Sequence, residues 1–189
     1  MPAPIPAWTT EGVLPPLDVT RPTSPQRAPY TVSLYDVVVR FGTSPARRAI
    51  LDGYLRHRAC LHANGYLAGF QWLDGSFMED VESQEFRAPN DMDVVSFVQA
   101  PLPAKPSPAD LDALDHDLAK ANFSVDSYFV EMDAVTPREL TFWSAYWYSV
   151  WAHRRNLAWK GFLQVELQPG DDASACLWLT QNAGVGVHP

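Results

Sequence analysis

Two short groups of residues in this chain have types and a spacing that suit metal-dependent chemistry on phosphate. Gly75 and Ser76 end one apolar run, and Asp91 and Asp93 begin the next, after the spacer 77–90. A Gly-Ser pair leaves backbone N–H groups free to hold a phosphate, and a helix starting there would also favour an anion. Carboxylates at i and i+2 of a strand point to one face and repel each other unless a cation lies between them. The pattern predicts a nucleoside triphosphate site with bound magnesium.

A third carboxylate is expected from a neighbouring strand, and Asp126 is the natural choice. It lies in the apolar segment 123–131, where an isolated acid is costly without a partner or an ion. We expect Asp126 to bind one metal and to act as base toward an acceptor hydroxyl. Two metals about 3.5–4 Å apart would stabilise the attacking and leaving oxygens together.

The order of these groups resembles that of the DNA polymerase beta-type nucleotidyltransferase superfamily. Four segments are similar to those of a small, uncharacterised bacterial family within it: Leu14-Pro15-Pro16, Trp72-Leu-Asp-Gly-Ser-Phe77, Pro89-Asn-Asp-Met-Asp-Val-Val95 and Lys160-Gly161. The resemblance implies transfer of a nucleoside monophosphate from a triphosphate to a hydroxyl, with pyrophosphate leaving.

The resemblance also implies a role for each matching residue. Gly75 and Ser76 would contact the phosphates, and three aspartates would hold Mg²⁺ or Mn²⁺, namely Asp91, Asp93 and Asp126. Lys160 and Arg154, together with Arg155, could reach the triphosphate as cations do in phosphoryl transfer. The arginines equally suit the C-terminal end of a helix, and Lys160 could equally be a surface lysine.

The spacer departs from the superfamily pattern. It is somewhat long, and it is acidic where small relatives often carry a basic residue; its acids are Glu79, Asp80, Glu82 and Glu85. Such a loop would repel a triphosphate unless metals intervene or the loop swings away. The alternative is a non-catalytic nucleotide-binding sensor or interaction module on the same fold.

The acceptor and the partners are less constrained. The superfamily implies a tRNA end, a protein hydroxyl in a toxin, defence or regulatory system, or a small molecule. The net charge of −8 disfavours an extended nucleic-acid surface. The aromatic segment 142–151 could stack on a base, fill the core, or bind a partner protein or a second copy of the chain.

Helices and strands are expected to alternate along the chain, and this order predicts an α/β or α+β fold with one mixed sheet flanked by helices. Helices are expected at 33–41 (where a strand fits equally well), 44–62, after the capping signal Ser107-Pro108-x-Asp110, 136–155 and 172–181, and strands at 66–73, 91–98, 123–131 and 161–167. Ile50, Leu51, Tyr54, Leu55 and Leu61 should face the core, as should the stripe Leu111, Leu114, Leu118 and Ala121.

We expect one nucleotidyltransferase-like domain at 30–168, preceded by an arm at 1–29 and followed by a tail at 169–189. The arm holds eight of the seventeen prolines and should wrap the domain over residues 8–17, with Trp8, Val13 and Leu14 as anchors. No apolar run is long enough to span a membrane, and no export signal is apparent. Two distant cysteines predict a reducing cytoplasm, and the His57-x-x-Cys60 pair is expected to be structural.

Overall fold

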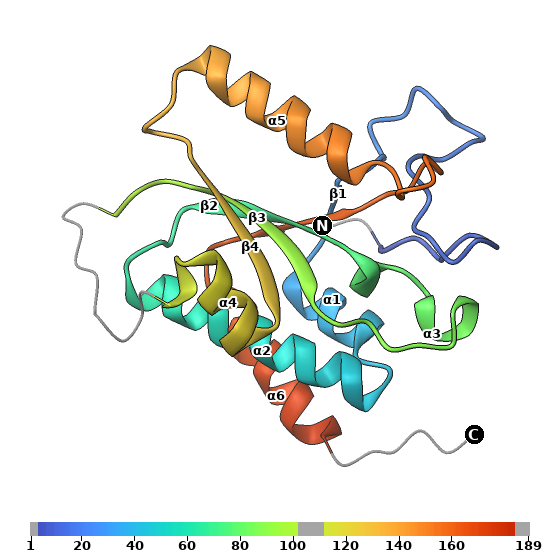
Figure 1. Ribbon diagram of the computed structural model, residues 1–189, viewed down its shortest axis with the longest axis horizontal. Coiled ribbons are helices and arrows are strands. Elements are labelled where there is room, and N and C mark those ends of the chain that lie inside the picture. The colour runs from blue at the N-terminus through green and yellow to red at the C-terminus, as the bar shows by residue number, and fades with distance from the viewer. Residues whose placement is uncertain (1–3, 102–111, 184–189) are drawn as a thin grey trace.

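Five strands form one mixed open sheet in the order β1-β5-β2-β3-β4 (Figure 1). The computed structural model describes residues 4–101 and 112–183. The strands are β1 (Tyr30–Thr31), β2 (Gly69–Asp74), β3 (Met92–Val98), β4 (Val125–Glu131) and β5 (Leu163–Glu166). β2 runs antiparallel to β3 and β5, whereas β1 with β5 and β3 with β4 are parallel pairs. The predicted single α/β domain with a mixed sheet is confirmed.

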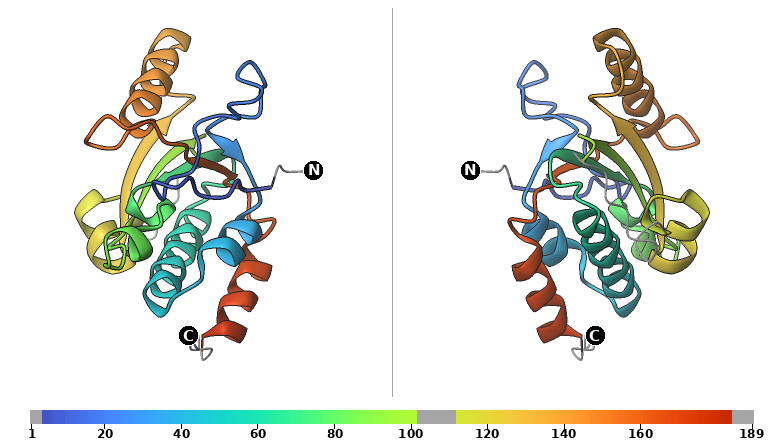
Figure 2. Two further views of the ribbon diagram at one scale, coloured as in Figure 1. Left: turned by 90° about the vertical axis from the view of Figure 1, so that its right-hand side faces the viewer. Right: turned by 90° about the vertical axis from the view of Figure 1, so that its left-hand side faces the viewer.

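Helices lie on both faces of the sheet. They are α1 (Leu34–Phe41), α2 (Pro45–Ala63), α3 (Val81–Gln84), α4 (His116–Phe123), α5 (Pro137–Trp151) and α6 (Asp172–Asn182), with a 3₁₀ turn η1 (Ser76–Met78). α1, α2 and α6 gather below the sheet, and α5 crosses above it (Figures 1 and 2). Within the two described ranges, no helix has the length and apolar character needed to cross a membrane.

The helix starts follow the capping signals in the sequence. The Ser33 hydroxyl accepts from the amide of Asp36 at the start of α1, and Ser44 does the same for α2. Thr136 and Glu139 form a reciprocal capping box at the start of α5. The predicted core positions of α2 are all buried: Ile50, Leu51, Tyr54, Leu55 and Leu61.

The predicted apolar stripe on the helix after residue 110 is wrong at Leu118 and Ala121, whereas Leu114 is partly buried against the core. α4 is capped by Asp115, whose carboxylate accepts from the Leu118 amide at 2.9 Å, so the helix begins at His116. Ala119 and Phe123, four residues apart, are the buried positions of this helix. Leu118 is instead 44% exposed, and Ala121 is exposed as well. The capping signal at 107–110 and Leu111 lie outside the described residues.

Two other segments differ from expectation. The spacer 77–90 is not an open loop, because η1 and α3 lie within it and bury Phe77, Met78 and Val81. α5 ends at Trp151 rather than Arg155, and the chain then turns back to form an isolated bridge between His153 and Trp159.

The N-terminal arm wraps the domain over residues 8–17, as predicted. Val13 and Leu14 are buried, and the Trp8 indole N–H donates to the Met78 carbonyl at 2.8 Å. The Gly161 amide donates to the Leu14 carbonyl at 2.6 Å. A Cβ at Gly161 would come within 2.4 Å of the Pro15 carbonyl oxygen, so the arm lies directly on the chain next to Lys160.

Candidate active site

Strand register places three aspartates in one row across the sheet. Asp74 at the end of β2 pairs with Asp93 in β3, and Asp93 pairs with Asp126 in β4. Directly paired residues carry their side chains on the same face, about 5 Å apart at Cβ. Asp91 comes just before β3. The structure thus brings together the three aspartates of the predicted metal site and adds Asp74 to the row.

Lys120 and His116 of α4 reach the outer end of this row. The Lys120 ammonium lies 3.0 Å from Asp91 Oδ2 and 2.8 Å from Asp126 Oδ2. His116 Nε2 lies 3.3 Å from Asp126 Oδ1, although that oxygen is buried without a hydrogen bond. We call Asp91, Asp93, Asp126 and Lys120 the open cluster.

Asp93 carries the least compensated charge of the open cluster. No hydrogen bond or ion pair to its carboxylate is formed by any residue the structure describes. Burial raises the pKa of Asp93 to about 6, and repulsion from Asp126 and Asp91 adds to the rise. The ionised form of Asp93 therefore calls for a cation beyond Lys120.

Gly75 allows the Asp93 carboxylate to lie against the end of β2. Its φ is +83°, a conformation that side-chain-bearing residues rarely adopt, and an added Cβ would fall 1.8 Å from Asp93 Oδ2. The expected helix at this point is only the three-residue η1, so a helix dipole cannot contribute to an anion site. What remains is the backbone of the turn and the Ser76 hydroxyl.

A second group of charges lies at the other end of the row, and we call it the closed cluster. The Lys160 ammonium, 5% exposed as a residue, lies 2.7 and 2.8 Å from the two oxygens of Asp74 and 3.3 Å from Glu79 Oε1. Arg154 contacts Glu79 Oε2 at 2.7 Å. Two carboxylates thus face two cations, and the cluster is neutral overall.

Burial and pairing oppose each other within the closed cluster. Burial raises the pKa of Asp74 to about 7, while the Lys160 ammonium acts to lower it. Burial alone would lower the pKa of Lys160, but Asp74 and Glu79 together raise it. The contact of one nitrogen with both carboxylate oxygens is that of an ammonium with an ionised acid, so we regard the pair as charged.

The acidic spacer does not present its charge to the site as expected. Glu79 is neutralised by Lys160 and Arg154, and the Glu82 carboxylate is held by Arg47 at 2.7 Å. Glu85 pairs with Arg87 at 2.7 Å. The repulsion that the sequence predicted is therefore largely cancelled by these ion pairs, of which those of Glu79 and Glu82 are tertiary contacts.

Both clusters line one cavity of about 820 Å³. This volume lies within the usual range of ligand sites, about 300–1,000 Å³. Its wall is strongly polar, and Gly75, Ser76, Asn90 and Arg155 complete it between the two clusters. All the residues predicted for catalysis and nucleotide binding therefore share one cavity.

The donor set of the open cluster suits a hard divalent cation, since oxygen ligands are those magnesium prefers. Asp126 Oδ1 is buried without a hydrogen bond, and the Lys120 ammonium occupies a cation position between two carboxylates. Across residues 4–101 and 112–183, however, no three His, Cys, Asp or Glu side chains are gathered closely enough to hold a metal ion. The three carboxylates would need to close around one.

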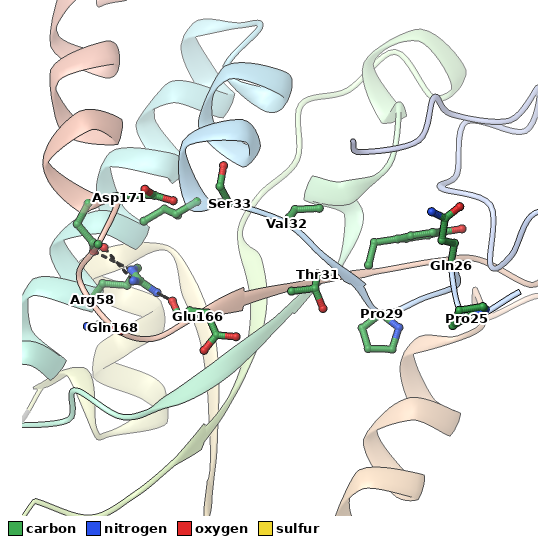
Figure 3. Close-up of a pocket in the computed structure, with 14 residues that line it drawn as sticks. Pro25, Gln26, Pro29, Thr31, Val32, Ser33, Arg58, Glu166, Gln168 and Asp171 are labelled. Atoms are coloured by element: carbon green, nitrogen blue, oxygen red, sulfur yellow. Dashed lines mark hydrogen bonds and ion pairs between the residues drawn. The ribbon is translucent and has the colours of Figure 1, made fainter. Parts of the chain in front are cut away.

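A second cavity, of about 630 Å³, lies beside β1, α1 and the start of α6 (Figure 3). Arg58 lies in its wall, and its side chain is fully buried. Its guanidinium contacts both carboxylate oxygens of Asp172, at 2.8 and 2.9 Å, and donates to the Glu166 and Leu167 carbonyls. Arg58 is thus fully engaged in joining α2 to α6 and β5, and a structural role accounts for it.

Two residues outside the site resolve the remaining sequence predictions. His57 is buried and contacts the Ala113 carbonyl through Nε2, and burial lowers its pKa to about 4. This supports the structural reading of the pair His57 and Cys60. Neither Cys60 nor Cys176 is joined in a disulfide.

Sequence reasoning missed four site residues: Asp74, Glu79, His116 and Lys120. Asp74 had a local signal, because it is the strand-ending residue directly before Gly75. Lys120 and His116 had none, since their contacts with Asp126 arise only when α4 packs against β4. Glu79 was interpreted as part of a repelling loop, and its partner Arg154 lies 75 positions away.

The fold and the cavity define the class of the protein: a single α/β domain with a five-stranded mixed sheet, whose strand ends carry a polar, carboxylate-rich cavity. Residues 6–166 match the model of the family of unknown function DUF6932, and the chain belongs to that family. No curated protein and no solved structure matches the chain.

Proposed function

We propose that this protein is a magnesium-dependent nucleotidyltransferase that moves a nucleoside monophosphate from a nucleoside triphosphate to a hydroxyl. The observation that carries the proposal is the row of Asp93 and Asp126 on paired strands, with Asp91 alongside and the Gly75 turn against it. Two partly buried aspartates on paired strands are unfavourable for stability alone, so their placement favours a functional reading.

Each residue has a role in this reaction. Asp91, Asp93 and Asp126 would hold Mg²⁺ or Mn²⁺, which when bound supplies positive charge to the triphosphate oxygens. The Gly75 and Ser76 backbone and the Ser76 hydroxyl would contact the phosphates, with Lys160 and Arg154 at the far wall. Asp126 takes the acceptor hydroxyl proton as the new oxygen–phosphorus bond forms, and the bond between the α- and β-phosphates breaks to release pyrophosphate.

We place the acceptor beside Asp126. The Tyr128 ring packs between His116 and Trp147, at centroid distances of 5.0 and 4.6 Å, and Trp147 belongs to α5. Burial and the charge of Asp126 raise the pKa of Tyr128 to about 12, so its hydroxyl stays protonated. The ring contact of Tyr128 with Trp147 therefore connects the surroundings of Asp126 with α5.

α5 supports a partner protein as the source of the acceptor hydroxyl. Trp151 is its one buried residue among those described, while Phe142, Trp143 and Tyr146 are 60%, 37% and 45% exposed. Exposed Trp and Tyr are enriched at the energetic centres of protein interfaces. Arg138 is the one cation of the helix, which argues against a polynucleotide on this face. A toxin, defence or regulatory system would provide such a partner.

We propose the cytoplasm as the location, because a reducing compartment suits a chain whose two cysteines form no disulfide. Cys176 is exposed, so an oxidising compartment would leave it open to intermolecular pairing.

The test is a thermal-shift screen of four ribonucleoside triphosphates with and without magnesium, followed by transfer of label from α-³²P triphosphate. A ligand at a hundredfold its dissociation constant stabilises the fold by about 2.7 kcal/mol. The shift should require magnesium and vanish in Asp91→Asn/Asp93→Asn, while Asp52→Asn, an exposed aspartate of α2, serves as the matched control. Absence of a nucleotide-dependent shift in the wild type would refute the proposal.

A second function, that of a non-catalytic nucleotide sensor, is favoured by one observation: Lys120 already bridges Asp91 and Asp126. Such a protein would bind a triphosphate without turnover. Binding that survives Asp126→Asn, together with no label transfer to any acceptor, would support the sensor over the enzyme.

A further inference from the structure

Lys120 stands where a metal ion of the open cluster would be expected. Its ammonium contacts Asp91 and Asp126 at 3.0 and 2.8 Å. A lysine ammonium is a compact point charge on a flexible stem, which makes it a close stand-in for a small cation. The contact joins the chain before β3 to the start of β4.

The position of Lys120 allows it to leave. It lies in the last turn of α4, and its side chain is 47% exposed, against 22% for Asp91 and 15% for Asp126. Apart from these two carboxylates, no described residue forms a hydrogen bond or ion pair with its ammonium. A swing of the stem would return the charge to water, while the carboxylates would stay in the cavity wall.

The charge count shows that Lys120 does not complete the cluster. Three carboxylates face one ammonium, and Asp93 receives no contact from it. A divalent cation would bring one more positive charge than Lys120 and could bind Asp93 as well. Replacement of the Lys120 ammonium by the metal is therefore favoured once the metal concentration is sufficient. The metal can bind only after the ion pairs of Lys120 with Asp91 and Asp126 have broken.

We propose that Lys120 is an internal counterion that competes with the divalent metal for Asp91 and Asp126, and that metal binding displaces it. The proposal rests on the metal site of the proposed function. It predicts that Lys120 keeps the metal-free cavity assembled and sets the metal concentration at which the site fills.

Metal binding measured without nucleotide tests this directly. Mn²⁺ affinity would be measured by electron paramagnetic resonance on the full chain for the wild type, Lys120→Met and Arg87→Met. Lys120→Met keeps the apolar stem and removes the charge. Arg87→Met is the matched control, because Arg87 lines the same cavity but pairs with Glu85 instead of the open cluster. We expect Lys120→Met to bind Mn²⁺ at least tenfold more tightly than the wild type, and the affinity of Arg87→Met to change by less than threefold.

Thermal melting supplies a second readout that does not depend on catalysis. Metal-free Lys120→Met should melt below the wild type, and saturating Mn²⁺ should raise its melting temperature by more than that of the wild type. If the wild type binds Mn²⁺ and Lys120→Met binds equally or more weakly, the competition is wrong while the metal site stands. If neither protein binds Mn²⁺, the metal site and the proposed function fail together.

Discussion

The two charged clusters share one cavity and one row of strands, yet they are balanced in opposite ways. The closed cluster sets Asp74 and Glu79 against Lys160 and Arg154, and every carboxylate in it has a cation. The open cluster sets three carboxylates against Lys120, and no described residue forms an ion pair with Asp93. Removing one partner from a fully paired buried charge destabilises a fold. A charged side chain that lacks a partner is instead a candidate to bind a ligand of opposite charge. In the proposed function, the closed cluster stabilises the wall of the cavity and the open cluster binds the metal.

The largest effect is expected from breaking the closed cluster. Lys160→Met leaves Asp74 and Glu79 buried with one cation between them, and loss of one partner from a buried pair costs about 3–5 kcal/mol. Urea unfolding at pH 7 measures this loss. Lys160→Met/Asp74→Asn removes both partners and should recover much of it, and a double variant no more stable than Lys160→Met would show that the pair is not the cause.

Neutralising the open cluster should act in the opposite direction. The pKa of Asp93 is raised from 3.8 to about 6, so the folded state binds the proton more tightly than the unfolded state. Its contribution to the free energy of unfolding is full below about pH 4 and falls as the pH rises through 6, by on the order of 2–3 kcal/mol.

Asp93→Asn should therefore stabilise the metal-free protein at pH 7 and flatten this part of the pH profile. Chemical unfolding of the wild type and Asp93→Asn between pH 4 and 7.5, with chelator present, checks it. If the free energy of unfolding depends on pH in the same way in both proteins, Asp93 does not carry the unbalanced charge that distinguishes the open cluster from the closed one. Added Mg²⁺ should stabilise the wild type but not Asp93→Asn.

Gly75→Ala tests the close contact between the two clusters, because Gly75 follows Asp74 of the closed cluster and lies against the Asp93 carboxylate of the open cluster. The alanine would be strained at φ +83°, and its Cβ would overlap Asp93 Oδ2. We expect a loss of about 1–3 kcal/mol, typical of a strained backbone position, and weaker Mn²⁺ binding as Asp93 is pushed aside. Gly170→Ala, where a Cβ meets nothing within 4 Å, is the control. Equal stability of the two variants would contradict the close contact.

The smallest effect is expected at Arg155, an exposed cation that lines the cavity but belongs to neither cluster. Arg155→Ala should change the free energy of unfolding by less than about 0.5 kcal/mol, as exposed substitutions usually do. Its effect on triphosphate binding should be smaller than that of Arg154→Ala in the same thermal-shift assay. A large loss of stability would mean that the closed cluster extends further than its contacts show.

Local sequence predicted most of the frame. Ser44 with Pro45 marked the start of α2, and the capping box at Thr136 marked α5, because capping depends on residues within one turn. Asp126 was expected beside Asp93 from its place in an apolar strand, and the strand register agrees. These inferences succeeded because each depended on neighbours in sequence or on the simplest pairing of strands.

The rest depended on contacts that no local pattern encodes. Lys120 reaches Asp91 across 29 positions of sequence only because α4 starts at His116, a start that the sequence alone placed earlier. The charge of Glu79 is cancelled by Arg154 and Lys160, which arrive from the other end of the chain. Composition showed an acidic spacer, whereas the sign of the potential at the cavity depended on tertiary pairing.

The place of β5 in the sheet has a consequence for synthesis of the protein. β5 is the last strand of the chain, yet it lies between β1, the first, and β2. A nascent chain that has emerged only through β4 can pair β2, β3 and β4 but must leave the β2 edge open. Asp74 would then lack its ion-pair partner Lys160, and the open edge of β2 could pair with another chain. The cavity can therefore form only after the chain has emerged through β5, and a chain truncated before residue 160 should aggregate rather than fold into a smaller domain.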